Sequence, residues 1–249
     1  MKADGFDLVD DFSDLFGMNA AGTDAKMRNT KESILEAQFT SGAGNWCTWM
    51  FGRDLVNWNN NFTWAKWVTP SRDLISAFKQ EGDEVRFKES IVYYDCNWSN
   101  YYPSDNYPFM YKCRSANSSI IKYRYADVLL LKAEALIMQD TPDLEGAADI
   151  IDKVRDRAKL GALPTSVRSN KNAMLNALLK ERRLELAFEG QRWFDLVRLD
   201  KVEEVMNAVY AKDSGRKAQI YTFDKNSYRL PIPQSVIDAN DKIHQNPGY

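Results

Sequence analysis

The sequence has little of what most metal sites and nucleophilic sites need. It carries a single histidine, His244, and three cysteines that show no C-x-x-C spacing. A zinc site with two or three histidine ligands is therefore excluded, and neither a zinc ribbon nor a disulfide framework is indicated. We expect no metal and no cofactor, and we expect His244 and the thiols of Cys47, Cys96 and Cys113 to be structural.

Long apolar runs and a strong charge of either sign are also missing. The formal net charge is −2 over 249 residues, which gives no basic footprint for nucleic acid. The best apolar stretch, 128–138, is interrupted by Lys132 and Glu134, and it is shorter than the roughly 18 residues of a membrane span. The N-terminus MKADGFDLVDDF lacks the hydrophobic core of a signal peptide. With 44% hydrophobic residues, the composition predicts a globular chain with a sizeable core.

The densest helical signal lies at 174–199 and predicts two helices jointed at Gly190. At about 100° per residue, four leucines share one side of the first helix with charged residues. Charges on such a face must be paired, because an isolated buried ion costs several kcal/mol. We predict a structural ion network made of Arg182, Glu185, Glu189, Arg192 and Arg198. A catalytic site is the alternative, since both arrangements perturb pKa values.

The first half of the chain shows only short periodic segments. Apolar residues at helical spacing predict a short helix over 4–16, and ILEAQFTS predicts a strand or an extended stretch over 34–41. Ser71 can cap a helix within 70–87, and IVYYDCNW predicts a strand that begins at Ile91. These elements leave much of the first half in loops.

The second half is predominantly helical by the same criteria. The pattern predicts one helix over 123–139 and a second that runs to Ala158, with Thr141 as its cap and Pro142 at its first position. Further along, AQIYTFDKNSYRLPIP predicts a β-hairpin over 218–233. The small residues of the first helix would let a neighbouring helix approach closely.

Between residues 45 and 111 the chain holds six of its seven tryptophans, interleaved with asparagines and without helical or strand periodicity. Aromatic faces stack on the C–H faces of sugar rings, and amide side chains hydrogen-bond sugar hydroxyls. The alternative is that these rings only pack a loop-rich subdomain. The candidate glycan-binding residues are Trp46, Trp49, Trp58, Trp64, Trp67, Trp98, Tyr101, Asn97 and Asn100.

Four stretches of the sequence resemble one known family. ERRLELAFEGQRWFDLVRLDK is similar to the signature of the SusD/RagB family. Three further stretches support the resemblance in family order: ESILEAQF at 32–39, YRYADVLLLKAEAL at 123–136 and LPIPQSVIDANDKIHQNPGY at 230–249. The resemblance implies a glycan-binding lipoprotein on the outer membrane of Bacteroidetes-type bacteria, at the cell surface, partnered with a SusC-like TonB-dependent transporter.

The resemblance also implies the architecture. We expect a mainly α fold of tetratricopeptide-like helical pairs, with a Trp-rich loop and short-strand subdomain and an extended C-terminal tail. We assign 1–249 to one domain, in which 1–117 is loop-rich and aromatic-rich and 118–249 is helical with the tail. Relatives begin with a lipoprotein signal and an N-terminal helical-repeat half. The match therefore covers the C-terminal half of such a protein, without the lipid anchor, as in a cleavage product, a split gene or an expressed fragment.

The implied function is non-catalytic binding of an oligosaccharide in a nutrient-uptake system. A helical-repeat scaffold that binds another protein is the alternative, although it leaves the tryptophans unexplained. A glycoside hydrolase would need two carboxylates on opposite sides of a sugar. The candidates by residue type are Asp83, Glu84, Glu89, Asp95 and Asp105. Their spacing singles out no pair, so we predict that the chain is not an enzyme.

Overall fold

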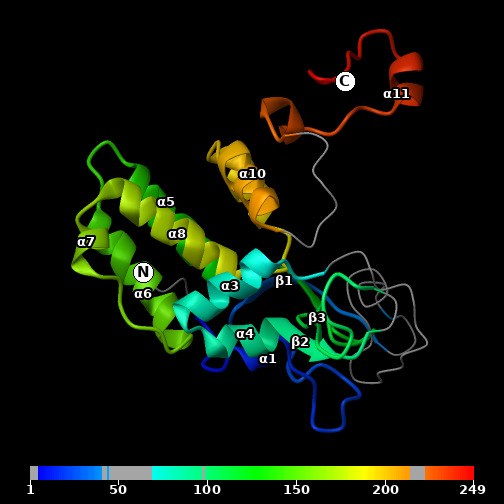
Figure 1. Ribbon diagram of the computed structural model, residues 1–249. Coiled ribbons are helices and arrows are strands. Elements are labelled where there is room, and N and C mark those ends of the chain that lie inside the picture. Colours follow the sequence, from blue (N-terminus) through cyan, green and yellow to red (C-terminus); the bar gives the residue numbers. More distant parts are fainter. Residues whose placement is uncertain (1–4, 41–43, 45–68, 97–98, 214–221) are drawn as a thin grey trace. The chain divides into compact units, whose positions relative to one another are not determined.

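A computed structural model describes residues 5–40, 44, 69–96, 99–213 and 222–249 of the chain (Figure 1). The chain divides into two compact units, Met1–Gly190 and Gln191–Tyr249. Most of the regular structure in the described residues is helical, which confirms the predicted mainly α fold. The assignment of the whole chain to one domain stays a prediction.

Helical pairs form the centre of the first unit. They are built from α5 (Tyr125–Met138), α6 (Leu144–Arg157), α7 (Thr165–Arg168) and α8 (Lys171–Glu185). Helix α5 packs against both α6 and α8 (Figure 1). Small residues at these contacts are fully buried and allow the backbones to approach closely: Ala126, Ala133, Ala147 and Ala148. This is the tetratricopeptide-like packing that the sequence predicts.

The cap of α6 differs from the expected one. The Asp143 side chain, and not Thr141, caps the helix by accepting a hydrogen bond from the Gly146 amide at 2.9 Å. An aspartate at this position satisfies an otherwise unpaired amide and also interacts favourably with the helix dipole. Thr141 and Pro142 precede the helix in the linker.

The short-strand part of the first unit lies after residue 69. It contains α3 (Arg72–Glu81), α4 (Glu84–Ser90), β2 (Ile91–Tyr94) and β3 (Tyr107–Met110). The Ser71 hydroxyl accepts from the Leu74 amide at 3.1 Å, so the predicted cap is confirmed. The single expected helix is broken into two, because Gly82 adopts a left-handed conformation with φ of 69°. Strands β2 and β3 then pair as an antiparallel hairpin.

The N-terminal segment contains α1 (Ser13–Phe16) and β1 (Ser33–Ala37), and β1 pairs antiparallel with β4 (Ile120–Arg124). The strand prediction is confirmed, but only the last turn of the expected helix over 4–16 forms. Aspartate side chains compete for the backbone amides, as at Asp11, which accepts from the Ser13 amide at 2.9 Å. Four apolar residues of the segment are nevertheless buried with Ile121: Val9, Phe12, Leu15 and Phe16.

The second unit contains short helices and a C-terminal segment. Its elements are α9 (Arg192–Arg198), α10 (Val202–Lys212), the 3-10 helix η1 (Lys225–Tyr228) and α11 (Gln234–Asp238). The expected hairpin over 218–233 falls partly outside the described residues, and within the described part its loop is η1 and residues 229–233 form no strand. The C-terminal tail turns back on residues 229–233. Gln245 exchanges two hydrogen bonds with the backbone of Ile232, at 2.7 and 2.9 Å.

Candidate functional site

Charged residues of α8 lie in a buried ion network within the first unit. Glu185 is fully buried, and its carboxylate accepts hydrogen bonds from Arg86, Arg124 and Arg157. Glu32, which precedes β1, bridges Arg124 and Arg157 at 2.6 and 2.8 Å. Each guanidinium therefore meets at least two carboxylates, and this pairing offsets much of the cost of removing the charges from water.

A second part of the network surrounds Glu189. The Lys112 amine donates to Glu189 Oε1 at 2.6 Å and to the Glu185 carbonyl oxygen at 2.8 Å, while Arg124 Nε donates to Glu189 Oε2 at 2.7 Å. Burial lowers the pKa of Lys112 to about 8, against the opposing effect of the Glu189 carboxylate. Burial would raise the pKa of Glu185, but the three arginines outweigh it and hold that pKa well below its usual value.

The structure brings together two of the five residues predicted to form the network, Glu185 and Glu189. Arg182 is also buried, but it pairs with Asp127 of α5 at 2.8 Å. The other two predicted members lie on α9 of the second unit, and their part in the network stays a prediction: Arg192 and Arg198. Helical periodicity identified the carboxylates of Glu185 and Glu189, but it identified neither Glu181 nor the cations that pair with them.

The partners that sequence reasoning missed come from separate segments of the first unit. They are Glu32, Asp83, Arg86, Lys112, Arg124, Arg157 and Glu181. Glu181 stands one helical turn before Glu185 on α8, whereas no local spacing links the other positions to that helix, so only the folded chain could show that they meet it. Their burial and mutual pairing favour a structural role that joins these segments to α8.

An open cavity of about 860 Å³ lies elsewhere in the first unit. Its lining comes from the start of α3 and from the segment that joins β2 to β3: Arg72, Cys96, Ser99, Asn100, Tyr101, Tyr102, Pro103 and Ser104. The two strands hold the ends of this segment together, because Tyr94 pairs with Tyr107 in the ladder. The cavity therefore combines aromatic rings with hydroxyl, amide and guanidinium groups.

Tyrosine rings fix the shape of this lining. The Tyr102 ring meets Tyr101 edge-on at 4.9 Å between centroids and Tyr107 edge-on at 5.6 Å. The Tyr102 hydroxyl donates to the Pro70 carbonyl oxygen at 2.7 Å, and the Tyr107 hydroxyl is 3.1 Å from the Ser99 hydroxyl. Edge-to-face contacts of this kind restrict ring orientation, so the tyrosines present a defined surface.

Two of the predicted glycan-binding residues, Asn100 and Tyr101, line the cavity. The others lie outside the described residues: Trp46, Trp49, Trp58, Trp64, Trp67, Asn97 and Trp98. Their assignment to glycan binding stays a prediction. Sequence reasoning missed Tyr102 and Arg72 as lining residues. Tyr102 stands in the aromatic-rich stretch 45–111 that the sequence did single out, whereas Arg72 gave no signal beyond its place in an expected helix.

Three further features can be assessed in the part of the chain that the structure describes: metal sites, cysteines and membrane-spanning helices. Within it, no group of three or more histidine, cysteine, aspartate or glutamate side chains could hold a metal ion. Cys96 and Cys113 are buried free thiols, and Cys47 lies outside the described residues. None of the described helices is both long enough and apolar enough to span a bilayer.

Comparison with known sequences points to one family. The sequence model of the SusD family matches residues 108–249, more than half of the chain. Two SusD-like proteins of Formosa agariphila are similar: P2 is 35% identical over 143 residues, and P38 is 42% identical over 99 residues. These matches cover 55% and 37% of this chain, but only 27% of P2 and 19% of P38.

Solved structures share the fold over nearly the whole chain. A laminarin-binding SusD-like protein is 24% identical with a TM-score of 0.67, and the match covers 98% of this chain and 54% of that protein. Surface glycan-binding protein A from Bacteroides uniformis is 20% identical with a TM-score of 0.71, and the match covers 97% and 53%. This chain therefore spans about half the length of these proteins. On its sequence match and its fold together, the chain belongs to the SusD family.

Proposed function

We propose that the chain is the glycan-binding part of a surface nutrient-uptake protein, and that it captures an oligosaccharide without chemistry. The observation that carries the proposal is the open cavity whose wall combines Tyr101 and Tyr102 with the Asn100 amide and the hydroxyls of Ser99 and Ser104. A sugar needs both kinds of contact, an apolar face for its C–H groups and hydrogen-bonding groups for its hydroxyls. The site would thus recognise a polyhydroxylated ring.

The proposed mechanism is capture on a preformed surface. The hydroxyl anchors of Tyr102 and Tyr107 hold the rings before the ligand arrives, so little conformational entropy is lost on binding. The cavity is open, which suits an internal stretch of a chain as well as its end. Since no covalent step is involved, the buried carboxylates of the ion network serve the scaffold and not the ligand.

Family membership and the names of two structural neighbours, a laminarin-binding SusD-like protein and a surface glycan-binding protein, support this proposal. We further propose the setting that the family implies. The protein would act at the outer membrane of a Bacteroidetes-type cell, held there by a lipid anchor outside this chain, and would hand its oligosaccharide to a SusC-like TonB-dependent transporter.

Calorimetric titration of the full 249-residue chain with a panel of oligosaccharides tests the function. Laminarin fragments come first, followed by starch and plant glycans. We expect a micromolar to millimolar Kd for at least one glycan. Tyr101→Ala should weaken binding by roughly 1–3 kcal/mol, as truncation of an interface anchor does. Tyr123→Ala is the matched control, because Tyr123 is 54% exposed on β4 and does not line the cavity.

Two results would contradict the proposal. One is the absence of binding by any glycan in the panel, and the other is an equal effect of the two tyrosine substitutions. A helical-repeat scaffold would then become the better hypothesis. One observation favours that alternative: Val128, Leu131 and Met138 share one face of α5 and are all exposed. If the chain is such a scaffold, Val128→Ser and Leu131→Ser should each reduce the amount of a co-expressed SusC-like transporter that co-purifies with the chain.

A further inference from the structure

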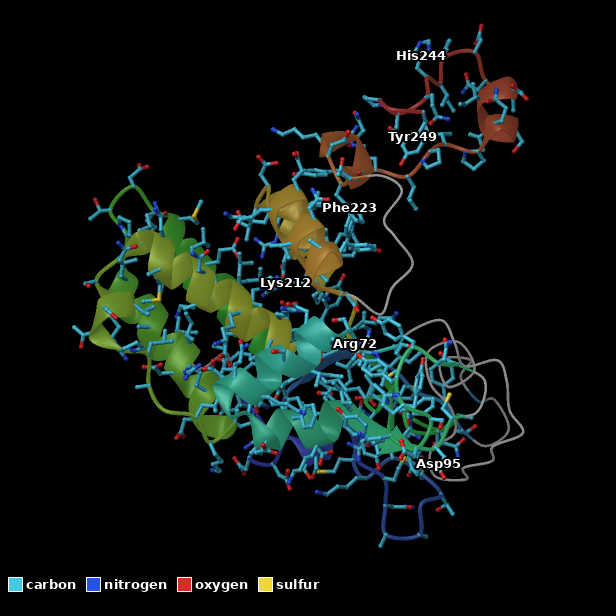
Figure 2. All side chains as sticks on the ribbon, viewed as in Figure 1. Arg72, Asp95, Lys212, Phe223, His244 and Tyr249 are labelled. Atoms are coloured by element: carbon cyan, nitrogen blue, oxygen red, sulfur yellow. The ribbon has the colours of Figure 1, made fainter. Side chains whose placement is uncertain are left out.

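Arg72, the first residue of α3 (labelled in Figure 2), lies against two aromatic rings of the cavity lining. Its guanidinium carbon lies 4.2 Å from the centroid of the Tyr101 ring and 4.4 Å from that of Tyr102. Both distances are well inside the range of about 6 Å in which a cation is attracted to a ring face. One guanidinium nitrogen also donates a hydrogen bond to the Tyr101 carbonyl oxygen. A single side chain therefore contacts two rings and the backbone of the segment.

The segment that Arg72 contacts has little regular structure of its own. Residues 99–106 contain neither helix nor strand. The backbone bonds recorded within the segment and at its start are from the Cys96 amide to the Ser104 carbonyl at 2.6 Å and from the Asn106 amide to the Pro103 carbonyl at 3.2 Å. Side chains therefore contribute to the geometry of this segment, from within it, as where the Tyr101 amide donates to the Ser99 hydroxyl at 3.3 Å, and from outside it.

The chain just before α3 supplies the other links. The Tyr102 hydroxyl donates to the Pro70 carbonyl oxygen at 2.7 Å, and the Tyr107 hydroxyl lies 3.2 Å from the Thr69 hydroxyl. Residues 69–72 thus contact residues 101–107 at three places, through Thr69, Pro70 and Arg72. Of these three residues, Arg72 is the one that contacts both cavity rings. Ser71 caps α3, which keeps the start of the helix, and with it Arg72, in place.

A lysine could not replace this arginine. The guanidinium is planar, so it can lie over a ring while its nitrogens donate in the same plane, whereas the lysine ammonium is a compact and strongly hydrated charge. The Arg72 guanidinium already contacts two rings and a carbonyl oxygen of the protein itself. The contacts of Arg72 are consistent with orienting the cavity wall, and they give no reason to expect that it attracts an acidic ligand.

We propose that Arg72 is the positioning residue of the cavity: it holds Tyr101 and Tyr102 in the arrangement on which a sugar ring stacks, and the site takes an uncharged stretch of glycan. This inference rests on the proposed function. It makes two statements that can be tested separately. The first is that Arg72 orders residues 99–106. The second is that the contribution of Arg72 to glycan binding does not depend on salt.

Hydrogen exchange measured by mass spectrometry tests the first statement on the full chain without any ligand. Arg72→Lys keeps the charge and removes the planar contact, so exchange should become faster in residues 99–106 and stay unchanged in α5 to α8. Tyr102→Phe removes only the link to Pro70 and should speed exchange less. Arg168→Lys is the matched control, because Arg168 lies on α7 and pairs with Asp152 away from the cavity. Unchanged exchange in 99–106 of the Arg72→Lys variant would overturn the positioning role, whether or not a glycan binds.

Calorimetry with the best glycan of the panel tests the second statement. Arg72→Lys should weaken binding about tenfold, equivalent to about 1.4 kcal/mol. The loss should be the same at low and high salt, because no charge on the ligand is neutralised. Retained affinity at low salt that disappears at high salt would show a direct contact between the cation and an acidic glycan, and it would overturn the inference. If wild type binds no glycan, the proposed function fails, and the exchange experiment still decides the role of Arg72.

Discussion

Replacing Glu185 by glutamine is the most direct test of the buried ion network. The substitution keeps the shape of the side chain and removes its charge. Glu185 is fully buried and accepts hydrogen bonds from three arginines, so the variant places a neutral amide against three guanidinium groups. Each arginine keeps another carboxylate, such as Glu181, which lies 2.5 Å from Arg86. The variant therefore leaves each of three buried guanidinium groups with one carboxylate fewer, so part of their positive charge is no longer compensated.

The expected loss in the free energy of unfolding is about 3–5 kcal/mol, the cost of breaking a buried ion pair by removing one partner. This is a large part of the roughly 5–15 kcal/mol that stabilises a typical domain. Urea denaturation followed by circular dichroism gives the change, provided that the slope of the transition is the same in both proteins. We expect a clear shift of the midpoint to lower urea.

Glu145→Gln is the matched control for this measurement. Glu145 also pairs with an arginine, Arg168, but its side chain is 70% exposed. Exposed pairs contribute less than about 1 kcal/mol, so the control should unfold close to wild type. A loss below about 1 kcal/mol in Glu185→Gln, with the slope unchanged, would refute the argument that the network stabilises the first unit.

The remaining predictions concern pH and one helix cap. Burial alone would raise the pKa values of Glu185 and Glu189. The neighbouring cations outweigh burial and hold both pKa values below the ordinary value of 4.5. The stability that these two ionised carboxylates contribute is present above pH 4.5 and is lost as the pH falls through their lowered pKa values in the folded protein. The urea midpoint should therefore drop on acidification below pH 4.5. It should drop less in Glu185→Gln, which lacks one of the two carboxylates. Asp143→Ala should cost about 0.5–2 kcal/mol in thermal or urea unfolding, since it removes the cap of α6. Thr141→Ala should change little, and the opposite order of these two variants would mean that the cap is wrongly assigned.

Local patterns in the sequence determined much of the architecture. The helix over 123–139, the cap at Ser71 and the strand within 34–41 follow from side-chain periodicity and from chemistry within a few residues, and all three are found in the structure. The family signature at 181–201 also depends only on the order of residues. Where local signals compete, the sequence was less decisive. Aspartate side chains that bind backbone amides shorten the helix expected over 4–16 to a single turn.

The tertiary structure alone decided which side chains meet. The sequence shows that Glu185 and Glu189 share an apolar face and so require cations, but it does not say that Arg124 and Arg157 supply them, because these arginines lie on other elements. The same holds for the cavity, because Arg72 and Tyr101 are 29 positions apart and meet only in the folded chain. Pairing between distant segments depends on how whole elements pack, and that packing leaves no trace in the spacing of residues along the chain.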